Sequence, residues 1–251
     1  MEEIKSLQKA ISILEELYNE KRSLSLSDLH RNLGYSKTTL VRLLGTLEKA
    51  GFVERNLDSL KYSLGLRLLI LSSDVYKNIT NHKCLRPVLE RIRDKSGETV
   101  FVNLLANGQR VCVECVESKK SVRIVPYIGQ AADLYYGASA KVILAHFSDE
   151  EIEDYLNNIE LKKMGPNSIT DKQALIEELK IIRQRGYATS IAELVRDYLS
   201  VSVPLLDPHN RPFGSLSIVA VAAQTEETIQ EFVRLIKWGS EQLSFLIRPL
   251  K

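Results

Sequence analysis

The spacing of apolar residues changes near position 97, and this change constrains the fold more than any other feature of the chain. Before that point apolar residues recur every three or four positions, as over 40–47, which is the period of amphipathic helices. After it come two valine-rich runs, 98–106 and 110–116, separated by Asn107-Gly108, a strong signal for a β-hairpin. The sequence therefore predicts a helical N-terminal part followed by a part that combines strands and helices.

The first 65 residues have the pattern of a winged helix-turn-helix. Ser27 and Ser36 are expected to cap the second and third helices, and Gly34 is expected to supply the left-handed turn that ends the second. Gly51 is expected to stop the third helix. The expected helices are 7–18, 28–33 and 37–50, and two short strands that form a hairpin are expected at 52–55 and 61–64.

One face of the third expected helix suits the major groove of DNA. If its leucines face the core, the opposite face presents small and basic side chains, and arginine can read guanine while threonine can touch a thymine methyl group. The segment 31–42 carries three cations and no carboxylate. We expect the following side chains to contact bases or phosphates: Ser36, Lys37, Thr38, Thr39, Arg42, Thr46, Arg55 and Lys61.

The rest of the chain predicts an α+β domain with a mainly antiparallel sheet. A helix over 66–76 is interpreted as the connection between domains, and the expected organisation is 1–65, a linker helix within 66–80, and a second domain over 81–251. Strands are expected at 98–106, 110–116, 121–125, 187–191, 199–206 and 213–221. Helices are expected at 83–95, 138–147, 150–157, 171–185 and 225–247.

The bulk composition narrows the class of protein. The formal net charge is only +2, so any affinity for DNA must come from a local cluster of cations. Three cysteines argue against a secreted disulfide framework, and the acidic, amphipathic N-terminus is unlike a signal peptide. The apolar runs are too short to span a membrane. We therefore expect a cytoplasmic protein without a membrane partner.

Motifs for metal binding and catalysis are weak. Cys112 and Cys115 have the CxxC spacing, but residues three apart in a strand are expected to point to opposite faces, which favours buried structural thiols. The four histidines are scattered, and neither a nucleophile elbow nor a phosphate loop occurs. We expect no metal, no cofactor and no catalytic residue.

Short stretches along nearly the whole chain resemble, in order and spacing, those of IclR-family transcription regulators. In the N-terminal part they are SLQKA at 6–10, LSDL at 26–29, SKTTLVRLLGTL at 36–47, GFV at 51–53 and KYSLG at 61–65. In the C-terminal part they are GETV at 97–100, GASAK at 137–141, RGYA at 185–188 and GSLS at 214–217. The resemblance implies a winged helix-turn-helix that binds double-stranded operator DNA, a GAF-like domain that binds a small-molecule effector, and a homodimer or tetramer.

The resemblance also implies which residues line an effector pocket: Gly137, Ala138, Ser190, Ser200, Ser217 and Val219. The helix start at Gly137-Ala138 and Ser217 match the family, and backbone N–H groups at a helix start suit an anion. Ser190 stands where an acidic residue is frequent, Ser200 where a cysteine is, and Val219 where a second serine is. These departures predict a neutral or partly apolar ligand, or a bulkier organic acid, in preference to a two-carbon acid.

Two other functions remain alternatives at this point. The chain could be an enzyme that acts on small acids, with its N-terminal part as a protein-interaction module, or a module that only dimerises. The sequence offers the enzyme no paired carboxylates in a motif and no activated nucleophile. The leading hypothesis is a sequence-specific DNA-binding regulator whose affinity for its operator is controlled by a small molecule.

Overall fold

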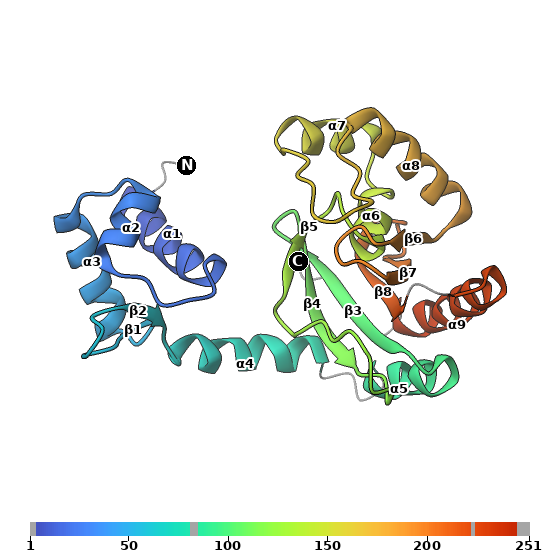
Figure 1. Ribbon diagram of the computed structural model, residues 1–251, viewed down its shortest axis with the longest axis horizontal. Helices are drawn as coiled ribbons and strands as arrows, with labels where there is room; N and C mark the ends of the chain where they lie inside the picture. The colour runs from blue at the N-terminus through green and yellow to red at the C-terminus, as the bar shows by residue number, and fades with distance from the viewer. Residues whose placement is uncertain (1–3, 81–84, 222–223, 245–251) are drawn as a thin grey trace. The chain divides into compact units, whose positions relative to one another are not determined.

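The computed structural model describes residues 4–80, 85–221 and 224–244 (Figure 1). The chain forms two compact units, Met1–Asn78 and Ile79–Lys251. Helix α4, Arg67–Thr80, runs from the first unit into the second. It is longer than the helix expected over 66–76.

The first unit has the element order of a winged helix-turn-helix, as the sequence predicts. Its elements are α1 Lys5–Asn19, α2 Leu26–Leu33, α3 Lys37–Lys49, β1 Val53–Arg55 and β2 Tyr62–Leu64. The three helices and the hairpin enclose one small core because each contributes one or two large apolar side chains to it. The buried members are Ile13, Leu17, Leu24, Leu29, Leu40, Leu44, Val53 and Tyr62.

Helix α2 begins two residues earlier than predicted, because Ser25 and not Ser27 is its N-cap. The Ser25 hydroxyl accepts the N–H of Asp28 at 3.1 Å, and the Asp28 carboxylate accepts the N–H of Ser25 at 3.1 Å. This reciprocal capping box satisfies two backbone donors that would otherwise be unpaired. The prediction of a left-handed residue at Gly34 is confirmed by its φ of 70°, and Ser36 caps α3 as expected.

The hairpin is joined to the helices at both ends. The backbone of Tyr62 exchanges hydrogen bonds with Leu24, the residue before the α2 cap, with N···O distances of 2.8 and 2.9 Å. At the exit of the hairpin, the N–H of Gly65 donates to Phe52 at 2.8 Å. A Cβ atom at Gly65 would overlap the carbonyl oxygen of Gly51, so this close approach requires glycine.

The second unit is built on a six-stranded sheet in the order β5-β4-β3-β8-β7-β6, and every neighbouring pair is antiparallel. The prediction of a mainly antiparallel α+β domain is therefore confirmed. The strands are β3 Thr99–Ala106, β4 Gln109–Val116, β5 Ala131–Asp133, β6 Ala188–Ile191, β7 Tyr198–Leu206 and β8 Pro212–Val221.

Helices cover both faces of this sheet (Figure 1). On one face α5, Leu85–Ser96, and α9, Glu226–Ser244, pack over the apolar side chains of the strands. On the other face lies α6, Ala138–Leu144, which packs against α8, and α7 joins the same apolar cluster. Helices α7 and α8 span Asp149–Asn157 and Lys172–Arg185. The expected start of α5 at Lys83 and the expected end of α9 at Ile247 lie outside the described residues.

One strand assignment from the sequence is wrong, and one strand was missed. The segment 121–125 is irregular, and its Val122 and Val125 are exposed, so a β-branched run here does not pair with the sheet. The three-residue strand β5 was missed because so short a run has no detectable alternation.

The prediction that Cys112 and Cys115 point to opposite faces is also wrong. In the β3–β4 pairing Val102 faces Glu114 and Asn103 faces Cys112, so Val113 is an extra residue in a β-bulge. The bulge shifts the alternation by one position. Both cysteines consequently pack in the same small cluster with Phe101.

Replacing Gly65 by alanine should loosen the first unit. The added Cβ atom must push apart the hairpin exit and the end of α3, which costs about 1–3 kcal/mol for an overpacked site. Hydrogen exchange of the α3 amides would report the change. Gly45→Ala is the matched control, because nothing beyond its own stretch of helix lies within 4 Å of its added Cβ and alanine favours the helix. Equal exchange rates in the Gly65→Ala variant and the native protein would contradict the prediction.

Candidate functional site

Helix α3 has the orientation that the sequence predicts. Leu40 and Leu44 are buried in the core of the first unit, so the opposite side of the helix faces solvent. Its residues are small or basic, which leaves room for the helix to lie in a groove of DNA. The exposed residues on this side are Thr38, Arg42, Gly45, Thr46 and Lys49, and Lys37 is exposed at the start of the helix.

The cations of this surface have no acidic partner. Among the residues that the structure describes, none of these side chains takes part in an ion pair: Lys37, Arg42, Lys49, Arg55 and Lys61. Arg31, by contrast, binds Asp28 at 2.9 Å, so it adds less to the positive field than the composition of 31–42 suggests. Cations without an acidic partner on α3 and on the hairpin are suited to bind phosphates.

Several expected contact residues already make hydrogen bonds within the unit. The Ser36 hydroxyl caps α3 and lies 2.9 Å from the hydroxyl of Thr39, which is half-buried. The Thr46 hydroxyl donates to the carbonyl of Arg42 at 3.0 Å. Arg55 lies over the ring of Tyr62, with 5.5 Å from its Cζ to the ring centroid.

The second unit contains a cavity of about 300 Å³. It lies on the sheet face that carries α6, between that face and the segments 124–127 and 193–195. Gly137, Ala138, Ser190, Ser200 and Val219, five of the six residues expected to line a pocket, do line this cavity. The size suits one small organic molecule.

Three of these residues form a row across the sheet. Ser190 pairs with Ser200, which pairs with Val219 on the next strand, so their side chains share the face that looks into the cavity. Ser217, the sixth expected residue, does not line it. Ser217 is fully buried on the same face, and its hydroxyl is 2.8 Å from that of Ser202.

Glu193 was not singled out by the sequence, yet it lines the cavity. It accepts the N–H of Gly137 at 3.0 Å and binds Lys141 Nζ at 2.6 Å. The backbone N–H of Gly137 was expected to meet the anion of a ligand, but a side chain of the protein occupies it. The backbone carbonyl of Glu193 also accepts a hydrogen bond from the Ser168 hydroxyl at 2.7 Å, which fixes the loop that carries Glu193.

Arg110 is the second lining residue that sequence reasoning missed. It is 7% exposed and lies on β4, directly after the hairpin turn. Only its Nη1 donates a hydrogen bond within the described part of the chain, to Asn103 Oδ1 at 3.3 Å, and Nε is buried without a partner. Burial lowers the pKa of this guanidinium. Arg110 and Cys112 are two residues apart in one strand, so their side chains lie on the same face of the sheet. This spacing could have indicated on which face Arg110 lies.

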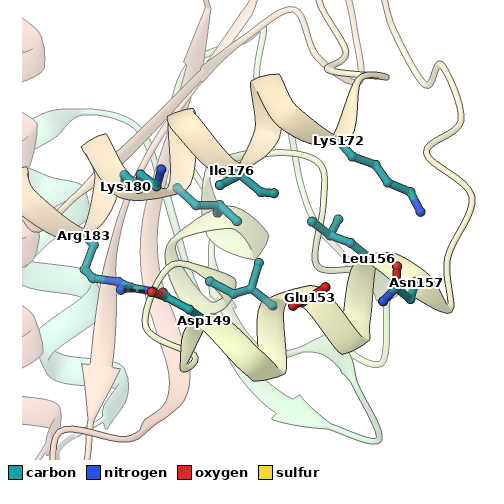
Figure 2. A pocket seen from close by; sticks show the side chains of 10 residues that line it. Asp149, Glu153, Leu156, Asn157, Lys172, Ile176, Lys180 and Arg183 are labelled. Carbon is teal, nitrogen blue, oxygen red and sulfur yellow. Dashed lines mark hydrogen bonds and ion pairs between the residues drawn. The ribbon is translucent and has the colours of Figure 1, made fainter.

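A second hollow, of about 370 Å³, lies between α7 and α8 (Figure 2). Its floor is apolar, and Arg183 at its rim binds Asp149 at 3.0 Å. The same guanidinium donates to the carbonyls of Ala145 and Phe147 at 2.6 and 2.9 Å. Arg183 therefore ties α8 to the end of α6, and its hydrogen bonds are used in the packing of these helices.

The described side chains of this unit give little support for a catalytic site. Within the described ranges no three His, Cys, Asp or Glu side chains come together in an arrangement that could hold a metal ion. Burial raises the pKa of the Cys112 thiol to about 11 and that of Cys115 to about 12, so neither is an activated nucleophile. No described helix is both long and apolar enough to cross a bilayer.

Comparison with known proteins agrees with this pairing of a DNA-binding unit and a unit with a cavity. The family model for the IclR helix-turn-helix domain matches residues 6–57, and the model for the C-terminal domain of bacterial IclR transcriptional regulators matches 75–245. The chain belongs to the IclR family. The HTH-type transcriptional regulator KipR of Bacillus subtilis is 31% identical, over 96% of both chains, and KdgR of Escherichia coli is 27% identical, over 96% of this chain and 92% of KdgR.

Solved structures of IclR-family regulators share the fold over nearly the full chain. The IclR transcriptional regulator from Alicyclobacillus acidocaldarius superposes with a TM-score of 0.82 at 27% identity, covering 98% of this chain and 99% of that one. The Thermotoga maritima IclR gives a TM-score of 0.68 at 32% identity, covering 97% and 98%. As an IclR-family member the chain is a DNA-binding transcription regulator with a helix-turn-helix unit and a C-terminal domain of the type that binds small-molecule effectors.

Replacing Lys141 by methionine should destabilise the second unit by about 3–5 kcal/mol, because it leaves the buried carboxylate of Glu193 without a counter-charge. Urea unfolding followed by circular dichroism would measure the loss. The matched control is Lys180→Met, which removes an exposed pair with Glu177 and should change stability little. If both variants unfold at the same urea concentration, the buried pair does not hold the cavity wall.

Cys112 and Cys115 should resist alkylation in the folded protein. Because burial raises both pKa values to about 11 or above, the thiolate fraction at pH 8 falls about a hundredfold or more below that of an exposed cysteine. Mass spectrometry after iodoacetamide treatment should find these two sites unmodified until urea is added or the pH approaches 11. Rapid modification at pH 8 without urea would contradict the raised pKa values of these thiols.

Proposed function

We propose that this IclR-family regulator reads its operator with the exposed side of α3 and that a small molecule in the cavity of the second unit changes its affinity for that operator. The observation that carries the first part is the row of unpaired cations and small side chains on α3. The second part is supported by the cavity, which is lined at five of the six positions that the family resemblance assigns to the effector pocket.

In this proposal the residues of the first unit have two roles. Thr38, Arg42 and the flanking Thr39 and Thr46 face base edges, where an arginine can make two hydrogen bonds to guanine. The remaining polar residues at the start of α3 and on the hairpin position phosphates, which orient the protein without reading sequence. These are Ser36, Lys37, Arg55 and Lys61.

We propose that residues 66–80 connect operator-binding unit 1–65 to effector-binding domain 81–251 and that two or four copies assemble. The exposed apolar side chains of α4 support self-association, since large apolar patches are rare on monomers. They are Leu69, Ile70, Leu71 and Val75. A two-fold assembly would present two α3 helices to a palindromic operator, and an effector would act by favouring one separation of these helices over another.

The proposed ligand class is a small organic molecule. An IclR homolog from Microbacterium hydrocarbonoxydans has been solved in complex with 4-hydroxybenzoate, and its fold matches this chain with a TM-score of 0.77 at 20% identity. The cavity of about 300 Å³ is consistent with a molecule of this kind. The proposed binding to DNA supports the cytoplasm as the site of action.

Arg42→Ala should lower the affinity for operator DNA by about 1–3 kcal/mol, which is about 5- to 150-fold, through loss of a base contact. Fluorescence anisotropy with the DNA upstream of the protein's own gene would measure it, with a scrambled duplex as competitor. Arg31→Ala is the charge-matched control, because Arg31 is exposed but already binds Asp28. Equal losses in both variants would refute base reading by Arg42.

Lys37→Ala tests whether Lys37 contacts a phosphate or a base. Loss of a phosphate contact should weaken binding to operator and scrambled DNA alike. It should also reduce the slope of log Kd against log salt concentration by the amount expected for one phosphate, about 0.9. The titration is repeated at two salt concentrations for both duplexes. A loss confined to the operator would assign Lys37 to a base instead.

A further inference from the structure

The described residues include five buried charged side chains, all in the second unit: Glu98, Arg110, Glu114, Lys141 and Glu193. Four of them have a counter-charge. Glu98 binds Lys120, Glu114 binds Arg86 at 3.1 Å, and Lys141 binds Glu193 at 2.6 Å. Arg110 is the exception, since it takes part in no ion pair within the part of the chain that the structure describes.

An unpaired guanidinium is costly in this position. Arginine is almost never buried without a partner, because its charge loses the solvation of water and cannot be neutralised by losing a proton. The single hydrogen bond to the neutral amide of Asn103 at 3.3 Å leaves the charge uncompensated. The Asn103 amide nitrogen in turn donates to the hydroxyl of Ser215 at 3.3 Å, which fixes the orientation in which Asn103 accepts from Arg110.

The guanidinium belongs to the wall of the cavity. The one carboxylate among the lining residues, Glu193, is already bound to Lys141 and to the N–H of Gly137. The lining therefore has an excess positive charge at Arg110. Most of the surface around it is apolar, with Phe101, Ile124 and Val219 among the contributors.

We propose that Arg110 is the anion receptor of this cavity and that the effector is an organic acid whose carboxylate binds Arg110 while its apolar body lies against the apolar wall. The proposal rests on the proposed function in assigning effector binding to this cavity. Arg110 was not among the positions that the family resemblance supplied. A guanidinium can bind a carboxylate through two parallel hydrogen bonds, which compensate its charge and fix the orientation of the ligand.

The proposal separates Arg110 from an arginine with a structural role. A structural arginine stabilises the empty protein, whereas a receptor without its ligand is a buried charge that costs stability. Arg110→Met removes the charge and retains much of the volume, so the melting temperature of the ligand-free variant should equal or exceed that of the native protein. Arg91→Met is the charge-matched control, because Arg91 lies over the ring of Trp238 on the side of the sheet that carries α5 and α9.

The test uses the full chain and pairs of probes that have nearly the same shape, of which one is an anion and the other a neutral amide: hexanoate with hexanamide, and benzoate with benzamide. Isothermal titration calorimetry without DNA gives the Kd of each. The native protein and Arg91→Met should bind an acid of the panel at least about tenfold more tightly than its amide, as charge-assisted hydrogen bonds to a buried guanidinium require. In Arg110→Met this preference should disappear.

Three results would overturn the proposal. They are equal affinities for acid and amide in the native protein, absence of any Arg110-dependent acid binding in the panel, and a fall in the melting temperature of ligand-free Arg110→Met. Operator binding is measured separately with the same compounds. If acids bind through Arg110 without changing operator affinity, the proposed control by this cavity is refuted and the role of Arg110 stands. If only amides change operator affinity, the role of Arg110 in effector binding is refuted and control by a small molecule stands.

Discussion

The ion pair between Lys141 and Glu193 holds together the elements that enclose the cavity. Lys141 lies on α6 and Glu193 in the loop after β6, so the pair joins the helix that covers the sheet to the loop that closes its side. The second carboxylate oxygen holds the backbone at the start of α6 through Gly137. Both side chains are buried, so loss of Lys141 leaves the Glu193 carboxylate without its counter-charge in an interior position. The helix, the loop and the sheet edge therefore keep one arrangement.

The two faces of the six-stranded sheet have different compositions, and this difference creates the site. The face under α5 and α9 is filled mainly by valine, leucine and isoleucine, and its buried Glu114 is paired with Arg86 of α5. The face under α6 carries a row of serines, Asn103 and Arg110. Large apolar side chains do not fill the space above this part of the sheet. A β-bulge at Val113 brings two cysteines onto this second face as well. The sheet is thus a core on one side and the floor of a cavity on the other.

The local signals in the sequence predicted most elements, because caps, turns and periodicity act over a few residues. The capped start of α3 at Ser36, the left-handed Gly34 and the hairpin at Asn107-Gly108 are such signals. Features that depend on distant residues were missed. The partner of Gly137 lies 56 positions away at Glu193, and the environment of Arg110 is formed by strands and loops far along the chain. The position of a residue in a strand predicts the face of the sheet on which its side chain lies. It does not predict whether a side chain of opposite charge lies nearby.

The hydrogen bond between Gly137 and Glu193 also determines how the cavity meets competing anions. A free acid directed at the Gly137 amide would compete with a carboxylate tethered to the same molecule, and a short tether confers an effective concentration of about millimolar or more. The Glu193 carboxylate thus acts as an internal occupant of this subsite, present at all times and independent of metabolism. Small anions of the cell therefore meet a filled position at the Gly137 amide, and Arg110 is the group of the cavity that is left for an acid.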